Sequence, residues 1–326
     1  MIKGLLGSIV VLFLLTSCAT TPKPIEVPVA PVTVQTPAEP APAPEKPINV
    51  RKPKIALVLG GGAVRGFAHI GVIKVLEAQG ISPDIVVGTS AGSVVGALYA
   101  AGYSGFDLQE MAFTLDRESV GEWIIPDRGF INGDALQAFV NKAVQNRPLE
   151  KLHKQFAAVA TDLQSGEMVV FQRGNTGQAV RASSSVPGVF QPVRINGHDY
   201  VDGGLTSPVP VKVARALGAD VIIAVDISGK PKYRKIESMT DIMLQTFGIM
   251  AQSISVPELA QADVVISPST GTIGPSDFAK KHEAILEGEK AAQAALPLIR
   301  QKLQAAAERL VDPLPSPNSF QSGEPR

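Results

Sequence analysis

Short apolar runs alternate with segments of helical periodicity through the middle of this chain. The runs are rich in β-branched residues and are bounded by turn signals, which is typical of buried strands. They occupy residues 55–59, 85–87, 156–161, 168–171 and 221–226. Helical patterns, such as 67–79 and 93–101, lie between several of them. This alternation predicts one α/β domain over residues 54–310, with a mainly parallel central sheet, flanking helices and a hairpin excursion near Met168.

The motif G-T-S-A-G at residues 88–92 falls at the turn between the second predicted strand and the helix that follows it. Ser90 is its central residue, and the small neighbours Gly88, Ala91 and Gly92 suit the sharp, strained turn of a nucleophile elbow. The helix N-terminus beside Ser90 also offers free backbone N–H groups. Ser90 is therefore a candidate nucleophile, and the alternative is a serine that only caps the helix.

A second glycine-rich segment, with the sequence G-G-G-A-V-R-G, follows the first predicted strand at residues 60–66. A glycine run at the end of a strand can point several backbone N–H groups at one place. Dinucleotide binding is the rival interpretation, but the G-x-G-x-x-G pattern fails in both registers: its sixth position from Gly60 is Arg65, and its third from Gly61 is Ala63. Arg65 either holds this loop through carbonyl or carboxylate groups or lies in solvent.

An aspartate followed by two glycines supplies a candidate base. Asp202 comes directly after residues 195–201, where the pair Asn196-Gly197 predicts a hairpin turn. A carboxylate within hydrogen-bond reach of Ser90 could take the serine proton directly and form a two-residue dyad, and partial burial would adjust its pKa to that task. An aspartate in this context is also a common turn residue.

A Ser-His-Asp triad is the competing arrangement. Of the four histidines, only His282 follows Asp202 as the hydrolase order requires, and its charged surroundings indicate a surface residue. His69 on the first helix and His198 in the hairpin are expected to be structural or exposed. No cluster of Cys, His and carboxylate residues has the spacing of a metal site.

The three motifs, in this order, resemble those of the patatin-like phospholipase family over about residues 54–270. The resemblance implies a three-layer α/β/α patatin-like fold, Ser90 as nucleophile, Asp202 as its base, and no cofactor. A segment common in bacterial members is similar to residues 181–190. The substrate class that the family implies is a membrane phospholipid or another acyl-ester lipid.

The resemblance also assigns the glycines of each motif. The oxyanion hole is expected in the loop, with N–H groups near Gly61 and Gly62 as donors. The loop residues that match the family motif are Gly60, Gly61, Gly62, Arg65 and Gly66. The elbow glycines are Gly88 and Gly92, and those of the aspartate motif are Gly203 and Gly204. Ala63 departs from the strict pattern, which has a glycine at this position.

The N-terminus predicts export and lipid attachment. Residues 1–17 hold a single cation and then an apolar run too short to span a membrane, which is typical of a signal peptide. Residues 15–18 resemble the lipobox of bacterial lipoproteins, which implies cleavage before Cys18 and lipidation of this cysteine, the only one in the chain. An ordinary secretory signal is the alternative. Ala19 favours anchoring at the outer membrane of a bacterial cell envelope, facing the periplasm.

The remaining segments and the charge complete the picture. Residues 18–53 are expected to be a lipidated N-terminus and a Pro-rich, extended tether, and residues 311–326 a disordered tail. The 30 basic and 30 acidic residues balance, so we expect no nucleic-acid partner. The apolar, methionine-rich face of residues 236–254 predicts either a flap or membrane-docking helix that admits acyl chains, or an ordinary core or dimer helix.

The sequence therefore indicates a serine acyl hydrolase that cleaves acyl esters of phospholipids or related lipids at the cell envelope. Two alternatives stay open. One is a thioesterase or carboxylesterase that uses the same machinery. The other is a non-catalytic scaffold that binds lipid or an envelope partner.

Overall fold

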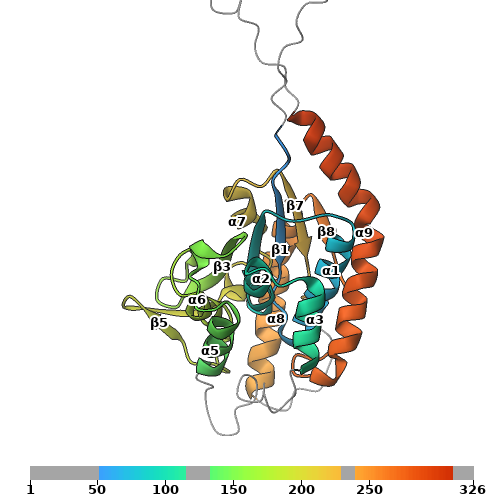
Figure 1. The fold of residues 1–326 in the computed structure, drawn as a ribbon. Helices are drawn as coiled ribbons and strands as arrows, with labels where there is room; N and C mark the ends of the chain where they lie inside the picture. Colours follow the sequence, from blue (N-terminus) through green and yellow to red (C-terminus); the bar gives the residue numbers. More distant parts are fainter. Residues whose placement is uncertain (1–50, 115–132, 229–238, 311–326) are drawn as a thin grey trace, which may run out of the picture. The chain divides into compact units, whose positions relative to one another are not determined.

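A central sheet of eight strands organises residues 51–114, 133–228 and 239–310, which are the parts of the chain that the computed structural model describes (Figure 1). Its strand order is β5-β6-β3-β2-β1-β7-β8, and β4 pairs with β3. The strands are β1 Ile55–Leu59, β2 Ile85–Thr89, β3 Gln155–Asp162, β4 Met168–Phe171, β5 Val193–Ile195, β6 His198–Asp202, β7 Val221–Val225 and β8 Val264–Ile266.

The middle of the sheet is parallel. β3, β2, β1, β7 and β8 pair in parallel, and β4, β5 and β6 are antiparallel additions beside β3. The turn between β5 and β6 lies at Asn196 and Gly197, which both have positive φ, as a tight hairpin turn requires. The predicted mainly parallel sheet and the hairpin near Met168 are confirmed.

The helices lie between the strands along the chain (Figure 1). They are α1 Phe67–Ala78, α2 Ala91–Ala100, α3 Gly105–Thr114, α5 Asp134–Ala143, α6 Thr176–Ser183, α7 Val211–Ala216, α8 Met239–Leu259 and α9 Lys281–Arg309. None of the helices in the described ranges is both long enough and apolar enough to cross a membrane.

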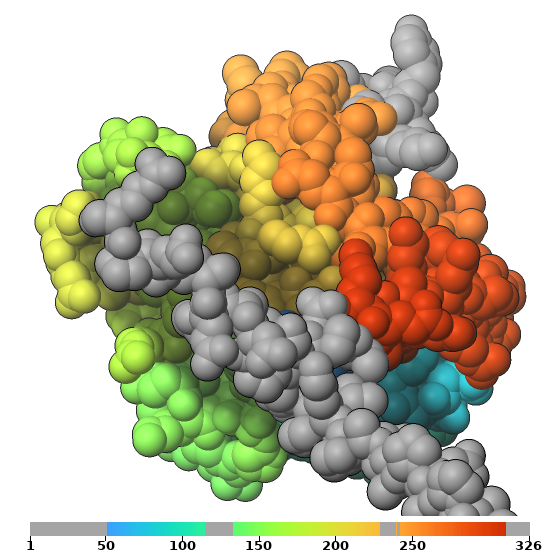
Figure 2. All heavy atoms as spheres, turned by 90° about the horizontal axis from the view of Figure 1, so that it is seen from above, coloured from blue at the N-terminus to red at the C-terminus, as the bar shows by residue number. Residues whose placement is uncertain are grey.

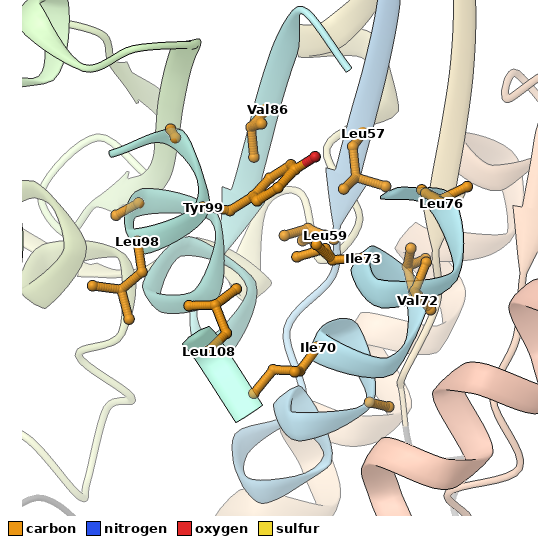
Figure 3. Packing of buried hydrophobic residues seen from close by; sticks show 14 of the residues in the cluster. Leu57, Leu59, Ile70, Val72, Ile73, Leu76, Val86, Leu98, Tyr99 and Leu108 are labelled. Carbon is orange, nitrogen blue, oxygen red and sulfur yellow. The ribbon is translucent and has the colours of Figure 1, made fainter. Parts of the chain in front are cut away.

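Alternate residues of β1 pack into two different apolar layers. Leu57 and Leu59 face α1, α2 and α9, and Figure 3 shows Ile73 of α1 beside Leu59. Ala56 and Val58 belong to the opposite layer, which α7 and the end of α8 cover. These four side chains of β1 are fully buried, as expected for a strand between two helical layers. The three-layer α/β/α fold is confirmed.

Two glycines bring α1 and α9 into close contact. A Cβ added at Gly71 would lie 2.0 Å from the Ile285 carbonyl oxygen, and one added at Gly288 would lie 2.0 Å from the Ala68 carbonyl oxygen. In Figure 2 the two helices, cyan and red, lie side by side. The sequence did not predict α9. His282 is exposed in its first turn and stacks on Phe113 with ring centroids 4.5 Å apart.

Several predictions fall outside the described residues. They are the signal peptide, Cys18, the tether up to residue 50 and the tail at 311–326. The helix predicted at 236–254 is found as α8. No side chain between Ile242 and Ile254 is buried, so a core helix is the wrong interpretation of this stretch.

Candidate active site

Ser90 occupies a strained turn between β2 and α2. Its φ of 53° and ψ of −124° lie where residues with a side chain rarely occur. The turn also needs its glycines: a Cβ at Gly88 would lie 2.4 Å from the Gly92 carbonyl oxygen, and one at Gly92 would lie 2.0 Å from that of Leu59. The Ser90 side chain caps no N–H group of α2, which argues against a helix-capping role.

Two neighbouring segments hold this turn in place. The Ser90 backbone N–H donates to Ser183 Oγ at 2.9 Å, and the Ser183 hydroxyl donates to the Val159 carbonyl oxygen at 2.6 Å. On the other side, Thr89 Oγ1 donates to the Ser207 carbonyl oxygen at 2.8 Å. Ser183 and Ser207 were not predicted as site residues from the sequence, because no sequence motif assigns a chemical role to either of them.

Asp202 lies at the end of β6, and its side chain is 6 % exposed. Its backbone N–H donates to the Ser185 carbonyl oxygen at 2.9 Å, and its Oδ1 accepts the Gly204 N–H at 2.7 Å. Oδ2 is buried and has no hydrogen-bond partner among the described residues. The carboxylate thus acts as a turn residue through one oxygen and leaves the other available.

The Ser90 hydroxyl is one of the groups that set the pKa of the Asp202 carboxyl. Burial raises the pKa of Asp202 to about 6, and the Ser90 hydroxyl and the Gly204 N–H limit the rise because they favour the ionised form. The Ser90 hydroxyl is close enough to act on the Asp202 carboxyl but makes no hydrogen bond to Oδ2. Such contacts are often loose in a site without substrate.

The glycine loop passes directly beside Ser90. A Cβ added at Gly61 would lie 3.3 Å from the Ser90 Cβ, and one at Gly66 would lie 2.7 Å from that of Ala91. Arg65 holds the loop through Nε, which donates to the Gly62 carbonyl oxygen at 3.1 Å. Burial lowers the pKa of Arg65, and the negative charge of Asp226 opposes this effect.

The hydrogen bonds of the loop show which N–H groups are available. Gly60 donates to the Val225 carbonyl oxygen at 3.1 Å, and Gly61 donates to that of Pro208 at 3.0 Å. The N–H groups of Gly62 and Ala63 donate to no group in the described parts of the chain. The available donors therefore lie one residue further along than the sequence suggested.

Ala63 adopts the backbone conformation that a glycine would favour. Its φ is 51°, in the left-handed region, where a side chain costs roughly 1 kcal/mol. The strict family pattern has a glycine at this position. Ala63 also lies in the wall of the adjoining cavity.

No histidine hydrogen-bonds to Ser90 or Asp202 within the described residues, which include all four histidines of the chain. His69 is fully buried, and its Nε2–H donates to the Gly60 carbonyl oxygen at 2.8 Å. Burial lowers the pKa of His69 to about 4, so it is neutral at pH 7. His69 therefore supports the glycine loop. His198 contacts Asp162 at the edge of the sheet.

An apolar cavity of about 570 Å³ begins at Ser90. Polar groups in its wall are few, and they include the hydroxyls of Ser90 and Ser184. Five helices contribute large apolar side chains to the lining: Phe67 and Ile70 of α1, Val94, Val95 and Leu98 of α2, Leu108 and Met111 of α3, Leu136 and Phe139 of α5, and Leu244 of α8. Val186, Val189, Phe190 and Phe278, which lie outside these helices, also line the cavity. Its volume is in the range of ligand pockets. Within the described residues, no three His, Cys, Asp or Glu side chains gather as a metal site.

Comparison with known proteins gives a family match over the part of the chain that holds the three motifs. The family model described as patatin-like phospholipase matches residues 57–215. An uncharacterized NTE family protein of Mycobacterium tuberculosis is 36% identical over 193 residues, which are 58% of this chain and 53% of that protein. Patatin-like phospholipase domain-containing protein 6 of Homo sapiens is 33% identical over 220 residues, which are 64% of this chain and 16% of that protein.

The solved structures that are similar include VipD from Legionella pneumophila, with a TM-score of 0.48 and 15% sequence identity over 78% of this chain and 67% of that chain. This chain spans about half the length of the mycobacterial relative. The family match runs from β1 to α7 and includes all three motifs. Residues 57–215 are thus similar to the patatin-like phospholipase family.

Proposed function

We propose that this protein is a serine acyl hydrolase that cleaves carboxylic esters of phospholipids or related acyl lipids. The observation that carries the proposal is the strained Ser90 beside the buried Asp202 carboxyl, at one end of an apolar cavity. The family supports the reaction class, and the cavity supports an acyl chain as the part of the substrate that binds beside Ser90.

In the proposed reaction, Ser90 Oγ attacks the ester carbonyl carbon while Asp202 Oδ2 accepts the hydroxyl proton. The carbonyl oxygen becomes an oxyanion, for which the N–H groups of Gly62 and Ala63 are the proposed donors. Each such donor contributes roughly 3 kcal/mol to transition-state stabilisation. The alcohol then leaves with the proton from Asp202, and an acyl-enzyme remains.

Deacylation reverses the roles. Asp202 takes a proton from water as the water oxygen attacks the acyl carbon, and the fatty acid departs as the proton returns to Ser90. With a pKa of about 6, Asp202 is largely ionised at pH 7 and is a stronger base than an ordinary aspartate. No step requires a histidine.

A thioesterase or a carboxylesterase of small substrates would use the same groups. The cavity favours a long acyl chain, because a short ester would leave most of its apolar wall uncovered. The non-catalytic scaffold is the less supported alternative, since a lipid-binding role alone does not account for a strained serine against a buried carboxyl.

We also propose that the protein is anchored in the bacterial envelope through lipidated Cys18. The lipobox-like residues 15–18 support this proposal. Expression of Cys18→Ala in a bacterial host should move the protein from the membrane fraction to the soluble fraction. Mass spectrometry of the wild-type N-terminus should show cleavage before Cys18 and added acyl mass, and an unmodified Cys18 would contradict the proposal.

The decisive test of the hydrolase proposal is fatty-acid release from mixed phospholipid vesicles by the full-length protein. Wild type should release fatty acid and react with a fluorophosphonate at Ser90. Ser90→Ala and Asp202→Asn should lose release at least a hundredfold, while the exposed Ser253→Ala should match wild type. Labelling without release would point to a different ester. Neither labelling nor release from folded wild type would favour the scaffold.

A further inference from the structure

Glu258 is a buried carboxylate outside the segment that matches the family. It lies in the last turn of α8, and its side chain is 4 % exposed. The Ser207 hydroxyl donates to it, with distances of 2.8 Å to Oε1 and 3.0 Å to Oε2. Burial raises the pKa of Glu258, and Ser207, Lys212 and the Val209 N–H counteract the rise. Glutamates are rarely buried without such partners.

The segment that Glu258 holds joins all three motifs. The Ser207 N–H donates to the Gly203 carbonyl oxygen at 2.8 Å, next to Asp202. The Ser207 carbonyl oxygen accepts from Thr89 Oγ1 at 2.8 Å, next to Ser90. The following residue, Pro208, accepts the Gly61 N–H at 3.0 Å, in the glycine loop. Two consecutive residues, Ser207 and Pro208, thus bond to the turn at Ser90, the turn after Asp202 and the glycine loop.

The backbone of Ser207 thus bonds to two of the motifs, and its side chain bonds to Glu258. α8 therefore anchors this junction at its C-terminal end, and Leu244 in its N-terminal half lines the cavity. The pair Ser207 and Glu258 connects a helix that touches the acyl cavity with the backbone that spaces Ser90, Asp202 and the loop.

We propose that Glu258 is a positioning residue for ester hydrolysis, and that it acts by accepting the Ser207 hydrogen bond that fixes the spacing of the three motifs. This inference rests on the proposed function of Ser90 and Asp202. Among the described residues, Glu258 bonds through its side chain to Ser207 and not to Ser90 or Asp202, and it carries no proton in the proposed reaction. A displacement of about 1 Å in a catalytic arrangement can lower the rate roughly 100-fold, which sets the expected size of the effect.

The test compares full-length Glu258→Ala, Ser207→Ala and Glu258→Gln with Glu308→Gln, an exposed glutamate of α9, as the matched control. The readouts are the rate of fluorophosphonate labelling of Ser90 and the kcat and KM for a soluble ester, each corrected for the folded fraction. Both alanine variants should lower the labelling rate and kcat by about 10- to 100-fold, with KM changed by less than about threefold.

Glu258→Gln keeps an oxygen that accepts from Ser207 and should stay within about threefold of wild type. The double variant Ser207→Ala with Glu258→Ala should be no slower than the slower single variant, because both remove one link. If Glu258→Ala does not fold, the labelling rate and kcat of Ser207→Ala alone test whether the hydrogen bond between the two residues positions the site.

Wild-type rates per folded molecule in the alanine variants would overturn the inference, and so would a glutamine variant as slow as alanine. These results leave the proposed function intact, because wild type and Glu308→Gln would still be active. Failure of the proposed function would look different: wild type itself would then neither label at Ser90 nor hydrolyse any ester.

Discussion

Strain at the candidate site is concentrated at Ser90 and Ala63. Five non-glycine residues in the described ranges have positive φ, and these two both line the cavity. At Ser90 the strained backbone presents the side chain on a sharp turn, and at Ala63 it leaves the N–H group without an acceptor among the described residues. Strain of this kind persists only where surrounding contacts enforce it. Here Ser183 and Ser207 accept hydrogen bonds from the Ser90 turn, and Arg65 donates one within the glycine loop.

The raised pKa of Asp202 predicts the acidic limb of the activity profile. In the proposed reaction, only ionised Asp202 accepts the Ser90 proton, so kcat/KM for a soluble ester should fall about tenfold per pH unit below pH 6. The measurement is kcat/KM between pH 4.5 and about 8, with circular dichroism to show that the protein stays folded. A profile that is flat down to pH 5 would exclude Asp202 as the base with this pKa.

The same shift predicts a stabilising substitution. The folded pKa of Asp202, about 6, lies above its ordinary value of 3.8. Its favourable contribution is therefore complete below about pH 4 and is lost as the pH rises through 6, where the carboxylate is buried with its charge. Asp202→Asn should raise the free energy of unfolding by about 1–3 kcal/mol at pH 8, with little gain at pH 4.

Urea unfolding of both proteins at the two pH values tests this expectation. An equal gain at pH 4 and pH 8 would mean that the asparagine stabilises through packing and that the Asp202 charge is not the cause.

Contacts between α1 and α9 hold in place the helical layer that contributes to the cavity wall. α1 and α9 cross so closely that Gly71 and Gly288 leave no room for a Cβ, since each faces the backbone of the other helix. α1 also supplies Phe67 and Ile70 to the cavity wall. The long α9 therefore supports the site without contributing a residue from its own length to it.

Gly288→Ala should destabilise the fold strongly. Its new methyl group would meet the Ala68 carbonyl oxygen at 2.0 Å, and the helices would have to separate, which costs about 3 kcal/mol or more. Gly248→Ala in α8 is the matched control, because nothing lies within 4 Å of the position and alanine favours a helix by about 1 kcal/mol. Thermal unfolding of both variants is the measurement. Equal melting temperatures would contradict the close crossing.

The surface of the molecule carries an apolar stripe along α8. Met239, Ile242, Ile249 and Met250 are exposed, and no charged residue occurs from Ile242 to Pro257. The same helix turns Leu244 into the cavity. For an enzyme whose substrate lies in a lipid surface, such a stripe beside the cavity suits contact with that surface, where apolar side chains leave water.

Ile249→Glu should therefore weaken binding of the full-length protein to phospholipid vesicles several-fold and leave hydrolysis of a soluble ester unchanged. Leu286→Glu on α9 is the matched control, since the two side chains are 51 % and 48 % exposed. Vesicle co-sedimentation gives the comparison. Equal losses in both variants would indicate a general charge effect, and no loss at Ile249 would leave a dimer contact as the role of the stripe.

Local sequence determined the elements that form the candidate site. The strand-to-helix turn at Ser90, the hairpin at Asn196 and Gly197, and the alternation of strands with helices all follow from residues a few positions apart, because backbone preference and side-chain periodicity are local properties. The order of the three motifs pointed to the family and hence to the pairing of Ser90 with Asp202.

Tertiary structure decided which of these groups are free and what surrounds them. The acceptors that engage Gly60 and Gly61 are Val225 and Pro208, more than a hundred residues away. No local pattern could therefore show that the N–H groups of Gly62 and Ala63 have no acceptor within the part of the chain that the structure describes. The cavity, the crossing of α1 with α9 and the contact of Ser207 with Glu258 likewise join distant segments. Hydrogen-bond satisfaction and burial depend on such partners, which only the folded chain brings together.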